Sequence, residues 1–118
     1  MSKTGKRTQP ADAAILSELA GIIASRRDGD AGTSYTARLL AGGAERCARK
    51  FGEEALELVI AALGSEHDEI AAEAADVLYH LLVLLEAGEV PLADVLDILR
   101  DRQGVGGLVE KAARGPDR

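Results

Sequence analysis

Apolar residues recur at intervals of three and four along most of the chain, which is the spacing of one buried face on an α-helix. In the first run, for example, Ile15, Leu19 and Ile22 fall on one side of a helix. Glycine, serine and proline separate the runs, so the pattern predicts an all-α fold, a bundle of about five helices. We expect these helices over residues 11–27, 35–41, 44–63, 65–87 and 91–103.

Residues between the runs predict where the helices begin and end. Ser34 can cap the short second helix, and the glycine pair at 42–43 interrupts the chain before the third. Gly64 suits the end of the third helix, while Ser65 can open the fourth. Pro91 suits the first turn of the fifth helix, because the first turn needs no backbone N–H from it.

The composition supports one helical domain with an aliphatic core. The chain has 118 residues, of which 47% are hydrophobic but only 3% aromatic. The run VLYHLLVLL, residues 77–85, is apolar on every side of its helix, so we predict that homodimerisation completes the bundle. The organisation we expect is a flexible tail over 1–10, the helical domain over 11–103 and a C-terminal extension over 104–118.

Charge and cysteine content exclude several classes of protein. The formal net charge of -6 opposes a nonspecific nucleic-acid binder, which needs a cationic surface along the phosphates. A single cysteine, Cys47, excludes an internal disulfide and fits a reducing compartment. No apolar stretch has the length of a membrane span or the character of a signal peptide. We therefore expect a soluble, cytoplasmic protein without nucleic-acid or membrane partners.

Acidic residues interrupt the apolar pattern at the start of the run KFGEEALELVIAAL, residues 50–63. On a helix, Lys50, Glu53, Glu54 and Glu57 fall within an arc of about 100° and therefore share one face. The fourth predicted helix repeats the anomaly with a polar stripe at spacings of four, three and four, made of Glu69, Glu73, Asp76 and His80.

Two acid pairs on successive apolar helices indicate a cation site. Glu54-x-x-Glu57 and Glu73-x-x-Asp76, brought face to face, would repel one another unless a cation lay between them. Oxygen ligands without cysteine select Mg²⁺, or Mn²⁺, over zinc. A ferritin-like di-iron site is excluded because it needs a Glu-x-x-His pair on each of two helices.

Each of these signals also has an ordinary structural explanation. A single acid pair is more often a solvated helix face or a contact with a helix N-terminus, so only the two pairs together indicate a cation site. For His80, a hydrogen-bonded core histidine is favoured over a metal ligand. A helical dimerisation module whose acids bind only a structural cation or water would account for the same pattern.

Basic residues cluster just before the acids, although the chain as a whole is acidic. Guanidinium groups and helix N-termini both bind phosphate oxygens. Each basic residue alone is more often a surface charge, but together with a cation site they indicate a phosphorylated substrate. The candidate phosphate-binding residues are Ser34, Tyr35, Arg38, Arg46, Arg49 and Lys50.

These residues also resemble a known family. The segments TSYTARLLAGGAERCARKFGEEALELVIAAL and EIAAEAADVLYHLLVLL are similar to the phosphoribosyl-ATP pyrophosphohydrolases, within the all-α MazG-like nucleotide pyrophosphohydrolase superfamily. The resemblance covers about residues 11–103. The superfamily motif falls on the two acid pairs, whereas SYTARLL and its distance from KFGEEALE are the more specific part.

The resemblance implies Mg²⁺-dependent hydrolysis of phosphoribosyl-ATP to phosphoribosyl-AMP and pyrophosphate, the second step of histidine biosynthesis, by a homodimer. The four motif acids would hold the metal, and Glu53 or Glu54 would orient the attacking water or take its proton. Arg46, Arg49 and Lys50 would hold phosphates. A house-cleaning hydrolase of noncanonical nucleoside triphosphates, sharing the same acids, is the alternative enzyme.

Overall fold

The computed structural model describes residues 11–104. The predicted tail over 1–10, and the predicted extension from residue 105 onward, lie outside this range. Within it the structure has helices and no strand, which confirms the all-α fold class. The five helices are α1 (Ala14–Ser25), α2 (Tyr35–Ala41), α3 (Gly43–Gly64), α4 (His67–Ala87) and α5 (Leu92–Gln103).

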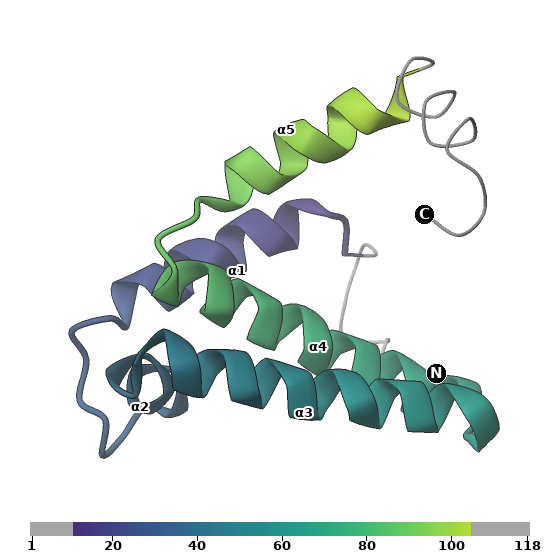
Figure 1. Cartoon of the computed structure of the whole chain (residues 1–118), viewed down its shortest axis with the longest axis horizontal. Coiled ribbons are helices and arrows are strands. Elements are labelled where there is room, and N and C mark those ends of the chain that lie inside the picture. Colours follow the sequence, from purple (N-terminus) through teal and green to yellow (C-terminus); the bar gives the residue numbers. More distant parts are fainter. Residues whose placement is uncertain (1–10, 105–118) are drawn as a thin grey trace.

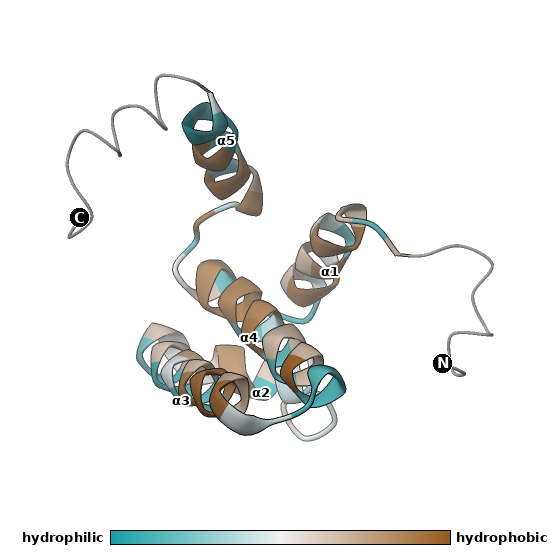
Figure 2. Cartoon of the chain, turned by 90° about the vertical axis from the view of Figure 1, so that its right-hand side faces the viewer, coloured by the Kyte–Doolittle hydropathy of each residue, from teal (hydrophilic) through white to brown (hydrophobic). Residues whose placement is uncertain are grey.

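The two longest helices form the centre of the fold. Figure 1 shows α3 and α4 running antiparallel side by side, joined by a short turn. The short helix α2 packs against both of them at one end of the pair, and α1 packs against α4. In Figure 2, α1 and α5 lie on the α4 side of this pair, apart from each other. The fold thereby brings the polar faces of α3 and α4 together.

A small apolar cluster holds the helices together where α1, α2, α3 and α4 meet. Its buried members are Ile23, Leu39, Leu40, Cys47, Leu82 and Val83. The Cys47 thiol donates a hydrogen bond to the Leu39 carbonyl oxygen at 3.3 Å. Burial raises the pKa of Cys47, so the side chain acts as a small apolar residue with a satisfied donor.

The start of α2 and the turn into α3 follow the prediction. The backbone N–H of Ala37 donates to Ser34 Oγ at 3.1 Å, so Ser34 caps α2 as expected. Gly43 then has a φ of 82°, in the left-handed region that residues with a Cβ rarely adopt. This glycine lets the chain change direction between α2 and α3 with a single residue.

The predicted boundary between the third and fourth helices was wrong by two residues. We expected Ser65 to open the fourth helix, but it caps the C-terminal end of α3, because its N–H donates to the Ala61 carbonyl oxygen at 2.8 Å. The next helix begins only at His67, after Glu66, whose side chain makes no cap hydrogen bond within the described residues. The backbone of Ser65 therefore still belongs to the last turn of α3.

The apolar run that the sequence indicated is only partly covered within the chain, and other helices expose apolar residues as well. In the run 77–85, His80, Leu82 and Val83 are buried, whereas Leu78 is 45% exposed. The outward face of α3 also exposes Leu56, Val59, Ile60 and Leu63, and α5 buries none of its residues. Figure 2 shows apolar colouring on α3 and on α5 as well as on α4. Among the described residues, no helix is long and apolar enough to cross a membrane.

Candidate functional site

Three carboxylates meet between α3 and α4. Glu54 and Glu57 extend from α3 and Glu73 from α4, and each offers a carboxylate oxygen within 4.8 Å of the others. Glu54 is 8% exposed and Glu73 is half-buried, while Glu57 reaches solvent. The antiparallel pairing of two helices, each with its acids one turn apart, produces this cluster. Hereafter we call these three residues the acid cluster.

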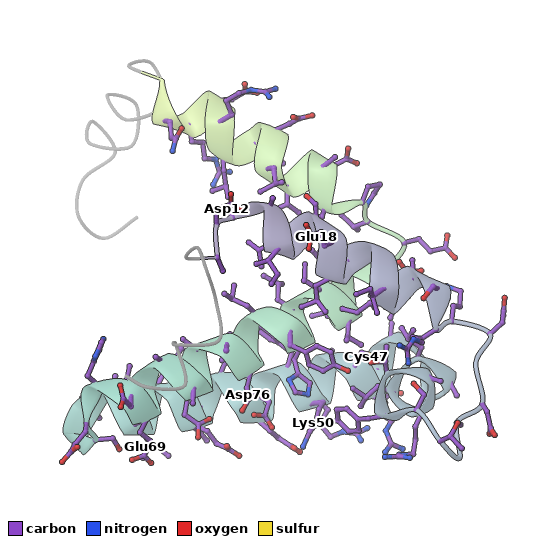
Figure 3. All side chains as sticks on the ribbon, turned by 180° about the vertical axis from the view of Figure 1, so that it is seen from behind. Asp12, Glu18, Cys47, Lys50, Glu69 and Asp76 are labelled. Carbon is purple, nitrogen blue, oxygen red and sulfur yellow. The ribbon has the colours of Figure 1, made fainter. Side chains whose placement is uncertain are left out.

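Asp76, the fourth predicted metal ligand, lies one turn after Glu73 on α4 but outside the group of oxygens within 4.8 Å. Its side chain is exposed, and its charge still acts on Glu73. Figure 3 labels Asp76 on α4 and Lys50 on α3, with Glu69 farther along α4. The role of Asp76 as a ligand stays a prediction.

Glu73 carries the clearest electrostatic signal in the acid cluster. Burial raises the pKa of Glu73, and the negative charges of Glu57, Asp76 and Glu54 raise it further. Its Oε1 atom is buried and has no hydrogen-bond partner among the described residues. An oxygen withdrawn from water and surrounded by like charges is stabilised by a cation. The donor set, made only of carboxylate oxygens, fits a hard divalent cation such as Mg²⁺ or Mn²⁺.

A cationic pocket of about 370 Å³ adjoins the acid cluster. Most of the predicted phosphate-binding residues line it, together with one of the acids: the lining is Tyr35, Leu39, Arg46, Arg49, Lys50 and Glu53. Arg49 also lies 4.0 Å from Glu45, an exposed pair that contributes little to stability. The sequence prediction that these cations gather beside the acids therefore has a counterpart in the structure.

Lys50 connects the pocket with the acid cluster. Its Nζ atom lies 3.4 Å from Glu54 Oε2 and 3.6 Å from Glu53 Oε1, and it also lines the pocket. The negative charge that Tyr35 would carry when ionised raises the pKa of Lys50, and Glu54 raises it further, against an opposing effect of burial. Lys50 therefore remains a cation at neutral pH, available to the pocket and to the acid cluster.

Two predicted phosphate-binding residues have other contacts in this structure. The Ser34 oxygen caps α2, as described above. Arg38 Nη1 donates to the Ala31 carbonyl oxygen at 3.1 Å, and its guanidinium carbon lies 5.6 Å from the centre of the Tyr35 ring. Neither residue is among those that line the pocket. Their roles in phosphate binding stay predictions.

Sequence reasoning missed a polar group formed between α2 and α4. Tyr35 Oη lies 3.1 Å from His80 Nε2, and Thr36 Oγ1 is hydrogen-bonded to Tyr79 Oη. His80 Nδ1 lies 2.7 Å from the Asp76 carbonyl oxygen, so His80 is the hydrogen-bonded core histidine that the sequence favoured. Composition gave one signal: the chain has only two tyrosines, and both belong to this group.

The helical fold, the acid cluster and the adjoining cationic pocket agree with the class that the sequence resembles, the helical nucleotide pyrophosphohydrolases. Residues 16–103 match the family model for phosphoribosyl-ATP pyrophosphohydrolase. The chain belongs to this family, which confirms the resemblance that the two acid pairs and the SYTARLL segment indicated.

Similar proteins from several bacteria carry the name phosphoribosyl-ATP pyrophosphatase. One from Cereibacter sphaeroides is 50% identical over 101 residues, covering 86% of this chain and 98% of the relative. One from Ruegeria sp. is 53% identical over 100 residues, covering 85% and 95%. One from Parvibaculum lavamentivorans is 52% identical over 105 residues, covering 89% and 96%. The similarity thus extends over nearly the whole length of each relative.

Proposed function

We propose that this chain hydrolyses phosphoribosyl-ATP to phosphoribosyl-AMP and pyrophosphate, the second step of histidine biosynthesis. The reaction depends on a divalent cation, Mg²⁺ or Mn²⁺. Family membership supports the choice of substrate, since the similar proteins are named for this activity. One observation supports the reaction type. The buried Glu73 Oε1, which has no hydrogen-bond partner among the described residues, lies among the carboxylates of Glu54 and Glu57, next to a cationic pocket.

The acid cluster would hold the cation, and Asp76 would complete the ligand set after a rotation of its exposed side chain. When bound, the cation supplies neutralisation of the triphosphate charge and a lowered pKa for the attacking water. The chain's own contribution is to place these ligands on two packed helices, which hold them in position before substrate arrives. Glu54, the most buried of the three, is the most firmly positioned.

The pocket side of the site would bind the phosphate chain. Arg46, Arg49 and Lys50 line it from the first turns of α3, so phosphate oxygens in the pocket would meet three cations. Lys50 lies between the pocket and Glu54, and can therefore contact a phosphate that also reaches the acid cluster. This arrangement holds a pyrophosphate leaving group beside the acids that orient the water.

Two residues remain candidates for the group that orients the water or takes its proton. Glu53 lines the pocket and is exposed, with Lys50 as an ion-pair partner at 3.6 Å. Glu54 is buried within the acid cluster, where a ligand role competes with proton transfer. We assign the role of proton acceptor to Glu53 because its carboxylate is outside the acid cluster and lines the pocket. Replacement of Glu53 by glutamine separates the two assignments through the pH profile of kcat.

The direct test is turnover with defined substrates. Purified protein with Mg²⁺ should release pyrophosphate from phosphoribosyl-ATP with a kcat/KM far above that for a panel of canonical and noncanonical nucleoside triphosphates. A preference for one of those triphosphates would favour the house-cleaning hydrolase instead. Absence of Mg²⁺-dependent pyrophosphate release from every substrate would favour a helical dimerisation module.

We also propose that the active form is a homodimer in which a second copy covers the outward face of α3. Four large aliphatic residues on that face, Leu56, Val59, Ile60 and Leu63, are between 55% and 84% exposed. They follow a spacing of three, one and three, so they form one continuous apolar stripe. Burial of such surface contributes about 25 cal/mol per Å², which favours association of two copies. Sedimentation at low micromolar concentration tests the proposal.

A further inference from the structure

The hydrogen bonds of His80 determine which way the Tyr35 hydroxyl points. His80 is 6% exposed, and its Nδ1 atom lies 2.7 Å from the Asp76 carbonyl oxygen. A carbonyl oxygen only accepts hydrogen bonds, so Nδ1 carries the proton and donates. In a neutral imidazole the other nitrogen, Nε2, is then without a proton and can only accept. Tyr35 Oη, at 3.1 Å from Nε2, must be the donor of this second hydrogen bond.

This arrangement leaves Tyr35 with a particular chemistry on its other side. Tyr35 is 40% exposed and lines the cationic pocket with Lys50 and Arg46. Burial raises its pKa, so the phenol stays neutral at physiological pH. Because its one proton is directed at His80, the oxygen offers only lone pairs to the pocket. A phosphate oxygen also offers lone pairs, so it makes a poor partner, whereas a hydroxyl or amino group that donates makes a good one.

We propose that His80 is a positioning residue that holds the Tyr35 hydroxyl as a neutral hydrogen-bond acceptor in the pocket, for a donor group on the nucleoside part of the substrate. This inference rests on the proposed function and replaces the phosphate contact that the sequence predicted for Tyr35. The second hydrogen bond between the same helices, Thr36 to Tyr79, fixes the start of α2 beside His80 and keeps Tyr35 in reach. Tyr35 thereby contributes to substrate selection, while the arginines and Lys50 bind phosphate.

The first test needs no turnover. Nitrogen-15 NMR of the imidazoles, recorded at about pH 8.5, above the range where histidines usually titrate, reports which ring nitrogen carries the proton. The chain has two histidines, and the side chain of His67 is 95% exposed, so it serves as the solvent-exposed reference. We expect His80 to hold its proton on Nδ1 alone, and this signal to change in Tyr35→Phe. A proton on Nε2 of His80 would overturn the inference even if the enzyme is active.

The second test separates a nucleoside contact from a phosphate contact. Tyr35→Phe should raise KM for phosphoribosyl-ATP about three- to tenfold, the loss of one hydrogen bond, with kcat within about twofold of the parent. The inhibition constant for inorganic pyrophosphate should stay within about twofold of the parent, because its ionised oxygens accept hydrogen bonds and pair with Arg46, Arg49 and Lys50 rather than with Tyr35. If pyrophosphate inhibition weakened as much as substrate binding, Tyr35 would be a phosphate contact and the inference would be wrong.

The third test asks whether His80 acts through Tyr35. His80→Asn keeps a donor for the Asp76 carbonyl but loses the acceptor for Tyr35, so it should raise KM about as much as Tyr35→Phe. His80→Gln places an amide oxygen near the position of Nε2 and should restore KM to within about twofold of the parent. His67→Asn is the matched control and should change nothing.

Combining the changes distinguishes positioning from general damage. His80→Asn added to Tyr35→Phe should raise KM no more than about twofold beyond Tyr35→Phe alone, because both remove the same hydrogen bond. Effects that multiply fully would mean that His80 supports the fold rather than the Tyr35 hydroxyl, and would refute the inference.

Discussion

Helices α3 and α5 both combine apolar and charged residues, but α3 packs along α4, whereas α5 packs against the apolar cluster through Leu92, its first residue. One face of α3 packs against α4, burying Cys47, Glu54 and Ala61, while α5 buries none of its residues. The acid cluster lies on the packed side of α3, where two helices fix the acids relative to one another. An amphipathic pattern thus specifies a helix, whereas a functional site also needs a second helix that holds it in place.

The largest expected effect comes from the packed side of α3. Glu57→Gln should lower kcat/KM by more than about 100-fold while the chain stays folded, because loss of even an indirect support of a metal ligand costs 10- to 100-fold. Asp97→Asn on α5, an exposed acid 3.0 Å from Arg100, is the matched control and should leave activity within about twofold. Kinetics with circular dichroism checks both. Near-normal turnover of the Glu57 variant would remove this residue from the metal site.

The outward side of α3 is expected to affect assembly. Leu63, which is 84% exposed in one chain, would be buried twice in a symmetric dimer, and each burial contributes about 1.5–3 kcal/mol. Leu63→Lys should therefore weaken association by at least about 100-fold. Thr33→Lys, in an exposed loop, adds the same charge and should leave association unchanged. Sedimentation equilibrium measures the difference, and an equally tight dimer from both variants would place the interface elsewhere.

A smaller effect is expected at the pocket. Lys50→Met removes a charge-assisted contact worth about 1.5–3 kcal/mol, so kcat/KM should fall by about one to two orders of magnitude with little change in Tm. Arg100→Met on α5 removes a charge from an exposed ion pair and should stay within about twofold of the parent. Should substitutions of Lys50, Arg46 and Arg49 all leave efficiency unchanged, phosphate binding would have to move towards Arg38 and Ser34.

The smallest effect concerns the pH dependence of stability without metal. Burial, and then Glu57 and Asp76, raise the pKa of Glu73 in the folded chain. The folded chain therefore binds the Glu73 proton more tightly than the unfolded chain does. The stability that results is fully present below the unfolded-state pKa of about 4.3, and it is lost as the pH rises through the folded-state pKa. Glu73→Gln stays neutral, so with a chelator its Tm should exceed that of the parent at about pH 8.

The advantage of the Glu73 variant should disappear near pH 4, where the parent is also protonated, and Mg²⁺ at about pH 8 should raise the Tm of the parent alone. Thermal melts at both pH values, with and without Mg²⁺, provide the measurement. Equal Tm values in chelator at about pH 8 would show that the charges of the acid cluster do not oppose folding.

Local signals account for what the sequence predicted well. Helix spacing, the Ser34 cap and the glycine pair at 42–43 act within a few residues, and the structure places them as expected. The convergence of Glu54 and Glu73 was predictable because two successive helices joined by a short turn must pack antiparallel.

Tertiary packing decides what the sequence could not. The burial of Leu82 and the exposure of Leu63 depend on where α1 and α2 lie, although both residues belong to apolar runs. The hydrogen bond of Tyr35 to His80 joins residues 45 positions apart, so no local sequence pattern predicts it. The boundary at Ser65 was missed because its backbone hydrogen bond, rather than its hydroxyl, determines its place.

The ion pairs of Lys50 imply an exchange of partners when substrate arrives. In this structure the Lys50 ammonium lies 3.4 Å from Glu54 and 3.6 Å from Glu53, so it is paired with both carboxylates. A phosphate entering the pocket would draw Lys50 away and release both carboxylates at the same moment. The free enzyme would therefore keep both carboxylates in ion pairs with Lys50, and they would be released only with a phosphate chain in place. Substrate binding would then release the carboxylates that its own hydrolysis requires.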